Sequence, residues 1–264
     1  MKLILMLLVV WWRRGRPPGA WAWPARWHPG EGTLPWPLLV VLPAAGVAAL
    51  LWLAGGWFWG LAAHLLALAV LVNCIGGTDW RPALAALAAD SASGDLQGVL
   101  HRLDELGAGA SAGEIRDAAG LPAAAREVLA LRFLREWFAV LFWFALLGAP
   151  GALAYRCLER LATTSAGAAR LLAWAEWPAL RTFGLAVAVS GHPGRGMGVW
   201  LDSLLARTDA ARVAGVYLEA ALEPVPEGVT PEAAVATQVQ ALREVFRRGV
   251  LAWLVLVAAL LILF

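Results

Sequence analysis

Charged side chains are scarce in this sequence. They make up 15% of its 264 residues, whereas hydrophobic residues make up 61%. A water-soluble globular domain carries about 25% charged and about 45–50% apolar residues. The formal net charge is only +2 and the arginines are spread along the chain, so we expect no nucleic-acid partner. The composition excludes an ordinary soluble domain and indicates that lipid surrounds much of the chain.

Cysteine, lysine and tyrosine are also rare. Cys74 and Cys157 form no CxxC motif and have no histidine at metal-ligand spacing, so we expect both to pack in apolar helices. The sequence contains no zinc motif and no Ser-His-Asp set, and we assign no catalytic residue, metal or cofactor. Tryptophan is abundant instead, with 16 residues, and its half-polar ring favours membrane interfaces. A GC-rich genome is the alternative explanation for this excess.

Long uncharged runs predict membrane helices. Residues 37–54 carry no charge, and residues 57–75 are interrupted only by His64. Gly55-Gly56 between the two runs leaves room for a tight turn, which predicts a helical hairpin. His64 has two interpretations: a functional ionisable group inside a span, or a neutral histidine hydrogen-bonded to a helix. Residues 1–12 are too short to span and predict an uncleaved half-span or interfacial helix.

A third apolar stretch covers residues 138–155. Gly148, Pro150 and Gly151 lie near its middle and predict a kink or break, because proline removes a backbone hydrogen bond and clashes with the preceding turn. Residues 171–189 are less apolar and predict either a buried or interfacial helix or a further crossing. The segment Thr230-Pro231-Glu232 predicts the start of a helix that runs through Arg247-Arg248 into a last span at 250–264.

Two segments are polar and amphipathic. The first, residues 79–131, has a helix start signal at Ser93-Gly94-Asp95 and a capping box at Ser111-x-x-Glu114. The second, residues 199–248, leads into the last span. Arginines gather next to the spans on the side of these segments, so we expect both to face the cytoplasm. This orientation requires four or five spans, with a return through either a re-entrant break at 148–151 or a crossing at 171–189.

A glycine-rich loop is predicted at 191–198. Its outer glycines have the spacing of a P-loop, but Met197 and Gly198 replace the lysine and the Ser/Thr that bind phosphate and magnesium. Gly194, Arg195 and Gly196 would offer backbone N–H groups and a cation to an anion. A flexible connector is the alternative interpretation.

Four polar residues flank the predicted break: Arg135, Glu136, Tyr155 and Arg156. They would bind the phosphate of a lipid or of another small phosphorylated ligand. Anchoring of the helix ends at the membrane interface is the alternative.

Residues 135–156 read REWFAVLFWFALLGAPGALAYR. This stretch resembles the signature of the AmpE family, bacterial inner-membrane proteins named for an association with β-lactamase induction. The family is related to the cobinamide-phosphate synthases (CbiB/CobD), which share the core Gly-x-Pro-Gly-Ala-x-x-Tyr-Arg, here Gly148 to Arg156. Weaker similarity covers Gly94-Asp95 and the segment from Arg247 to Leu254. The resemblance implies one all-α, multi-pass domain over residues 1–264 in the inner membrane.

The chain departs from the synthases where they carry carboxylates. Leu131 and Arg135 stand in place of a Glu and an Asp, and Ala162 stands in place of another Asp. The downstream Asn-Ala-Gly-x-Pro-Glu-Ala segment has no counterpart in residues 209–221. The resemblance therefore implies a regulatory or sensory role linked to cell-wall status. A synthase-like membrane enzyme and a binder or transporter of lipids or small molecules are the alternatives. Nothing in the sequence indicates an oligomeric state.

Overall fold

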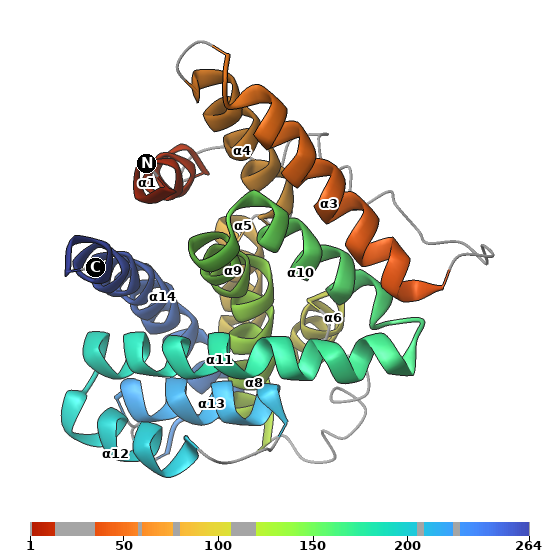
Figure 1. The fold of residues 1–264 in the computed structure, drawn as a ribbon. Helices are drawn as coiled ribbons and strands as arrows, with labels where there is room; N and C mark the ends of the chain where they lie inside the picture. The colour runs from red at the N-terminus through yellow and green to blue at the C-terminus, as the bar shows by residue number, and fades with distance from the viewer. Residues whose placement is uncertain are drawn as a thin grey trace. The chain divides into compact units, whose positions relative to one another are not determined.

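The computed structural model describes residues 2–13, 35–57, 60–75, 80–106, 120–204, 209–223 and 228–263. Within these ranges every regular element is a helix, which confirms the all-α prediction (Figure 1). The predicted capping box at Ser111 and Glu114 lies outside the described residues.

The chain divides into two compact units, each assembled from segments that are distant in sequence. The first unit comprises Met1–Thr78, Arg135–Ala179 and Leu256–Phe264, and the second comprises Asp79–Leu134 and Leu180–Val255. Two of the unit boundaries fall inside long continuous helices, α11 (Ala166–Ser190) and α14 (Pro231–Leu263). The polar segments 79–131 and 199–248 therefore both belong to the second unit.

The predicted helical hairpin belongs to the first unit. Helix α3 (Trp36–Ala54) begins with Pro37 in its first turn, where the missing N–H is not needed, and a turn at Gly55 leads towards α4 (Leu61–Cys74). The Nδ1 atom of His64 lies 2.6 Å from the carbonyl oxygen of Gly60, so this histidine is bonded to its own helix. Helix α1 (Lys2–Arg13) packs on α4.

Within the described residues, α3 is the one helix that is long and apolar enough to cross a bilayer, and none of its apolar window is buried. Helix α4 is equally free of charge, but its 14 residues extend about 21 Å, less than the roughly 30 Å of a hydrocarbon core. The expected total of four or five spans stays a prediction.

The predicted helix break is confirmed. Helix α9 (Ala139–Leu147) ends at Gly148, whose φ of 74° and ψ of −160° are accessible to glycine alone at low energy. Helix α10 (Ala149–Leu161) begins at the next residue. Pro150 lies in the first turn of α10 and favours a new helix start there, while Gly148 provides the non-helical backbone. Helix α10 then packs against α3, α4 and α9.

The second unit is built around α8 (Leu121–Phe133), which packs along α13 (Ala210–Ala221). Phe133 at the end of α8 stacks on Phe246 of α14 with ring centroids 4.0 Å apart, and it also lies 6.3 Å from the ring of Phe183 of α11. Three helices from separate parts of the sequence therefore share one aromatic core.

The predicted glycine-rich loop at 191–198 is wrong. Helix α12 (Pro193–Ser203) includes Gly194, Arg195 and Gly196, so only Gly191 and His192 separate it from α11. A Cβ atom on Gly196 would lie 2.8 Å from the Cα atom of Ala188, which means that glycine permits the two helices to touch. Tertiary contact has overridden the low helix propensity of these glycines. Arg195 donates a hydrogen bond to the carbonyl oxygen of Leu222, at 2.8 Å.

Both predicted helix starts in the polar segments are confirmed. The hydroxyl of Thr230 accepts a hydrogen bond from the amide of Ala233, and α14 continues from Pro231 through Arg248 without interruption. In the other segment, α5 (Trp80–Ala92) turns at Gly94 into α6 (Leu96–Glu105).

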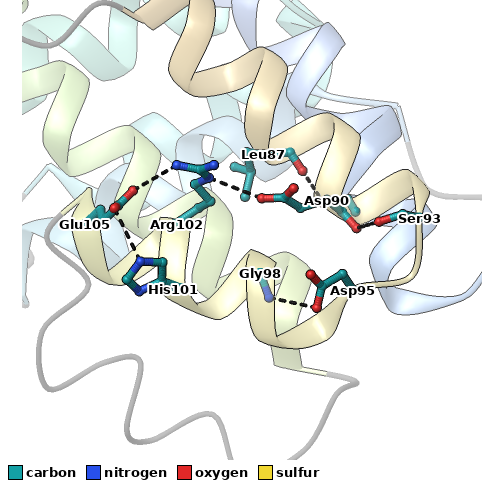
Figure 2. Close-up of polar contacts among 9 residues, drawn as sticks. Leu87, Asp90, Ser93, Asp95, Gly98, His101, Arg102 and Glu105 are labelled. Atoms are coloured by element: carbon teal, nitrogen blue, oxygen red, sulfur yellow. Dashed lines mark hydrogen bonds and ion pairs between the residues drawn. The ribbon is translucent and has the colours of Figure 1, made fainter.

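Side chains join α5 to α6 across this turn. Figure 2 shows the carboxylate of Asp95 accepting a hydrogen bond from the amide of Gly98, at 3.0 Å, which caps α6. Arg102 donates to Asp90 of α5 at 3.2 Å and to Glu105 at 3.3 Å. The buried residues Val99 and Leu103 face away from this polar edge.

Removing the cap should loosen α6. We expect Asp95→Ala to cost about 1 kcal/mol of local stability and to accelerate hydrogen exchange of the first-turn amides of α6 about fivefold. Asp95→Asn retains an acceptor and should exchange nearly as the parent does. Asp104→Ala, at the opposite end of the helix, is the matched control. Equal exchange in the alanine and asparagine variants at position 95 would contradict the capping role.

Candidate functional site

The described part of the first unit exposes apolar side chains and buries charged ones. Large apolar residues lie exposed on α1, α3, α4, α9 and α11, and Trp52 and Trp174 are 81% and 63% exposed. In contrast, Glu136, Arg156 and Glu176 are 5% exposed or less. This distribution is the reverse of a water-soluble domain, in which charged residues are almost never fully buried unless they are paired.

The pair Arg135–Glu176 lies at the centre of the buried charges. Arg135 belongs to the single π-helical turn η3 (Leu134–Phe138), and Glu176 belongs to α11. Nε of Arg135 lies 2.5 Å from Oε1 of Glu176, and Nη2 lies 3.2 Å from Oε2. This two-pronged geometry is the strong form of an arginine–carboxylate interaction. The Arg135 side chain is 33% exposed and that of Glu176 only 3%.

Helix α10 brings its polar residues to the same carboxylate. Tyr155 donates a hydrogen bond to Oε1 of Glu176 at 3.4 Å, and its side chain is buried. One residue later, Arg156 forms an ion pair with Glu159 on the next turn of α10. Arg156 also attracts the buried carboxylate of Glu136 electrostatically. Three helical segments thus converge on one connected group of charges.

We call Arg135, Glu136, Tyr155, Arg156, Glu159 and Glu176 the buried ionic cluster. When all its groups are ionised, three carboxylates face two guanidinium groups, and both arginines are already bonded to a carboxylate. A phosphate would have to bind at the outward edge of Arg135, whose Nη1 atom makes no hydrogen bond within the described part of the chain. Among the described residues, no group of three histidine, cysteine or acidic side chains lies close enough together to hold a metal ion.

The structure brings all four predicted ligand residues, Arg135, Glu136, Tyr155 and Arg156, into this cluster. The helix break precedes it on α10, because Pro150 lies one to two turns before Tyr155. The predicted anion residues Gly194, Arg195 and Gly196 belong to the second unit and are not part of the cluster.

Glu176 is a residue of this cluster that the sequence did not predict. It was visible only as one of the charges that made residues 171–189 less apolar. A carboxylate in an otherwise apolar helical run is itself a signal, because burying it requires a partner. Its partner Arg135 is 41 residues away, so the sequence does not reveal the pair.

A second polar network lies in the second unit. The buried side chain of Arg181 on α11 donates to the hydroxyl of Tyr217 on α13 at 2.9 Å and to the carbonyl oxygen of Leu204 at 3.2 Å. The Tyr217 hydroxyl also lies 2.6 Å from that of Ser203, on α12. The Trp200 indole donates to the Arg181 carbonyl oxygen at 2.8 Å. These hydrogen bonds connect α11, α12 and α13 and hold the three helices together.

Comparison with protein-family models, with curated proteins and with solved structures finds no match to this chain.

Breaking the central ion pair should destabilise the first unit. We expect Glu176→Gln to cost about 2 kcal/mol, less than for a fully buried pair because Arg135 is partly exposed. The double variant Arg135→Leu with Glu176→Leu should lose less than the sum of the two single leucine variants. Thermal unfolding in detergent measures each step. Glu219→Gln breaks an ion pair with Arg126 in which the carboxylate is 66% exposed, and it is the control. Additive losses at 135 and 176 would refute the coupling.

Proposed function

We propose that this chain is a multi-pass protein of the bacterial inner membrane, with the first unit in the bilayer and the polar segments 79–131 and 199–248 of the second unit exposed to the cytoplasm. The inverted polarity of the first unit carries this proposal. Helix α3 has 19 residues, none of them charged and none of them buried. Surface of this kind would be a large apolar patch in water, whereas in lipid it needs no further cover.

The buried ionic cluster also supports a location of the first unit in the membrane. Ionisable groups inside membrane-embedded bundles face the protein interior and pair with one another, as Arg135 and Glu176 do. Each charged group then has the opposite charge as its partner in a region where water is scarce.

Helix α14 supports the orientation. Its apolar part, from Gly249 onwards, follows directly after the exposed Arg247 and Arg248. Both arginines hold Glu244, and their hydrogen bonds lower the pKa of that carboxyl to about 2. Arginines next to a membrane segment favour the cytoplasmic side, where anionic lipids attract them.

For the cellular role we propose an AmpE-like regulatory or sensory function linked to cell-wall status and β-lactamase induction. The resemblance of residues 135–156 supports it. The two ends of that segment meet at Glu176, so the segment that resembles the family also builds the cluster. Binding of a small phosphorylated or lipid ligand at the outward edge of Arg135 is a second candidate, favoured by the 33% exposure of that side chain.

Topology is the first test. In a background with Cys74→Ala and Cys157→Ala, single cysteines introduced by Ala108→Cys and Thr237→Cys should resist a membrane-impermeant maleimide in intact cells. Both should react after the inner membrane is permeabilised, and the protein should stay with membranes during alkaline extraction. Periplasmic labelling at either position would contradict the orientation. Release of the protein by alkali would contradict membrane insertion.

The cellular role is tested by two phenotypes. Deletion of the gene in its host should alter the rise in β-lactamase activity that a β-lactam produces, and plasmid-borne expression should restore it. The same chain should not rescue growth of a strain that lacks cobinamide-phosphate synthase on cobinamide, because Leu131 and Arg135 cannot act as the missing carboxylates. Rescue in the second assay would favour the enzyme alternative.

A further inference from the structure

One corner of the first unit combines exposed arginine with exposed tryptophan. It lies where α10 ends at Leu161 and α11 begins at Ala166 (Figure 1). Gly167 on the first turn of α11 packs against Trp36 at the start of α3: a Cβ atom at this glycine would lie 2.9 Å from the indole nitrogen. The uncharged helix α3 therefore begins at the level where α10 has become charged and α11 starts.

The exposed face of α11 in this unit is apolar and aromatic. Leu171, Trp174 and Trp177 are 46%, 63% and 41% exposed and follow one another at intervals of three residues. At 100° per residue, neighbours in this series are about 60° apart and form one stripe. Glu176 lies about 160° from the centre of the stripe and is buried against Arg135 and Tyr155. The stripe therefore faces out of the protein.

Arg170 borders the stripe on α11, and the partly buried Arg160 lies on the last turn of α10, just before the chain enters α11. Neither Arg160 nor Arg170 forms an ion pair with a carboxylate in the described part of the chain, and Arg170 makes only a 3.4 Å hydrogen bond to the carbonyl oxygen of Ala166. Exposed arginine beside exposed tryptophan matches the headgroup layer of a bilayer, where phosphates attract the cation and the indole ring lies half in apolar surroundings.

We propose that Arg160, Arg170, Leu171, Trp174 and Trp177 form a surface that binds the phospholipid headgroup layer. This inference rests on the proposed insertion of the first unit into a bilayer. The part of α11 in this unit, residues 166–179, then lies along the membrane interface instead of crossing it. It carries Arg170 and Glu176, and α11 as a whole, although 25 residues long, is not apolar enough to qualify as a membrane span.

Depth measurements with spin labels test the placement of α11. In the background lacking Cys74 and Cys157, labels are attached after Trp174→Cys, Leu42→Cys in the middle of α3, or Val216→Cys on α13 of the second unit. The protein is studied in nanodiscs that contain phosphatidylglycerol. We expect the label at 174 to show an oxygen-to-nickel-chelate accessibility between those of the hydrocarbon-buried label at 42 and the water-exposed label at 216.

The outcomes separate the two proposals. A label at 174 as accessible to the nickel chelate as that at 216 would show that the stripe faces water and would overturn the headgroup surface. A label at 174 as deep as that at 42 would overturn it as well, because α11 would then lie in the core. If the label at 42 is itself accessible to the nickel chelate, the insertion of the first unit is wrong, and the headgroup surface fails with it.

The role of the arginines is tested separately. Binding of a fluorescent phosphatidylglycerol to the detergent-solubilised protein is measured by energy transfer from tryptophan. We expect Arg160→Gln and Arg170→Gln to weaken binding about fivefold each, whereas the lysine variants keep the charge and most of the affinity. Arg212→Gln, at an exposed position of α13, is the matched control. Unchanged binding in the Arg160→Gln/Arg170→Gln double variant would overturn the headgroup site.

Discussion

A buried charge must lie beside an opposite charge, and the arrangement of the first unit follows from this constraint. A single carboxylate left alone in an apolar interior is costly enough to oppose folding or to take up a proton. Glu176 avoids this by accepting two hydrogen bonds from Arg135 and one from Tyr155. Those bonds hold η3, α10 and α11 together, so the cluster determines how these three segments pack.

The second unit uses different interactions. Its interior contains the stacked rings of Phe133 and Phe246, and its buried Arg181 donates to hydroxyl and carbonyl oxygens. Its helix starts are capped by short polar side chains such as Asp95. Aromatic packing inside and charge outside suit water, whereas the exposed leucines and tryptophans of the first unit suit lipid. The two units thus differ in which side chains they bury and which they expose.

Residues 135–156 have a clear structural role. They contain the π-helical turn, the break at Gly148 and the first half of α10. Because the break redirects the chain, Tyr155 and Arg156 return to the neighbourhood of Arg135 at the other end of the segment. Gly148 and Pro150 therefore help to bring together the polar residues at the two ends of the segment. A ligand at this place would act on a group of charges that already joins three helices.

Local signals in the sequence determined the helical class, the α3–α4 hairpin, the break near Gly148 and the start of α14 at Thr230. Each depends on residues within one or two turns, where backbone geometry and capping act directly. Two features required the tertiary structure. The pairing of Arg135 with Glu176 joins residues far apart in the chain, and the helix at 193–203 packs closely on α11 where Gly196 meets Ala188. Such contacts exist only after folding, and their energies outweigh the local preferences that a sequence displays.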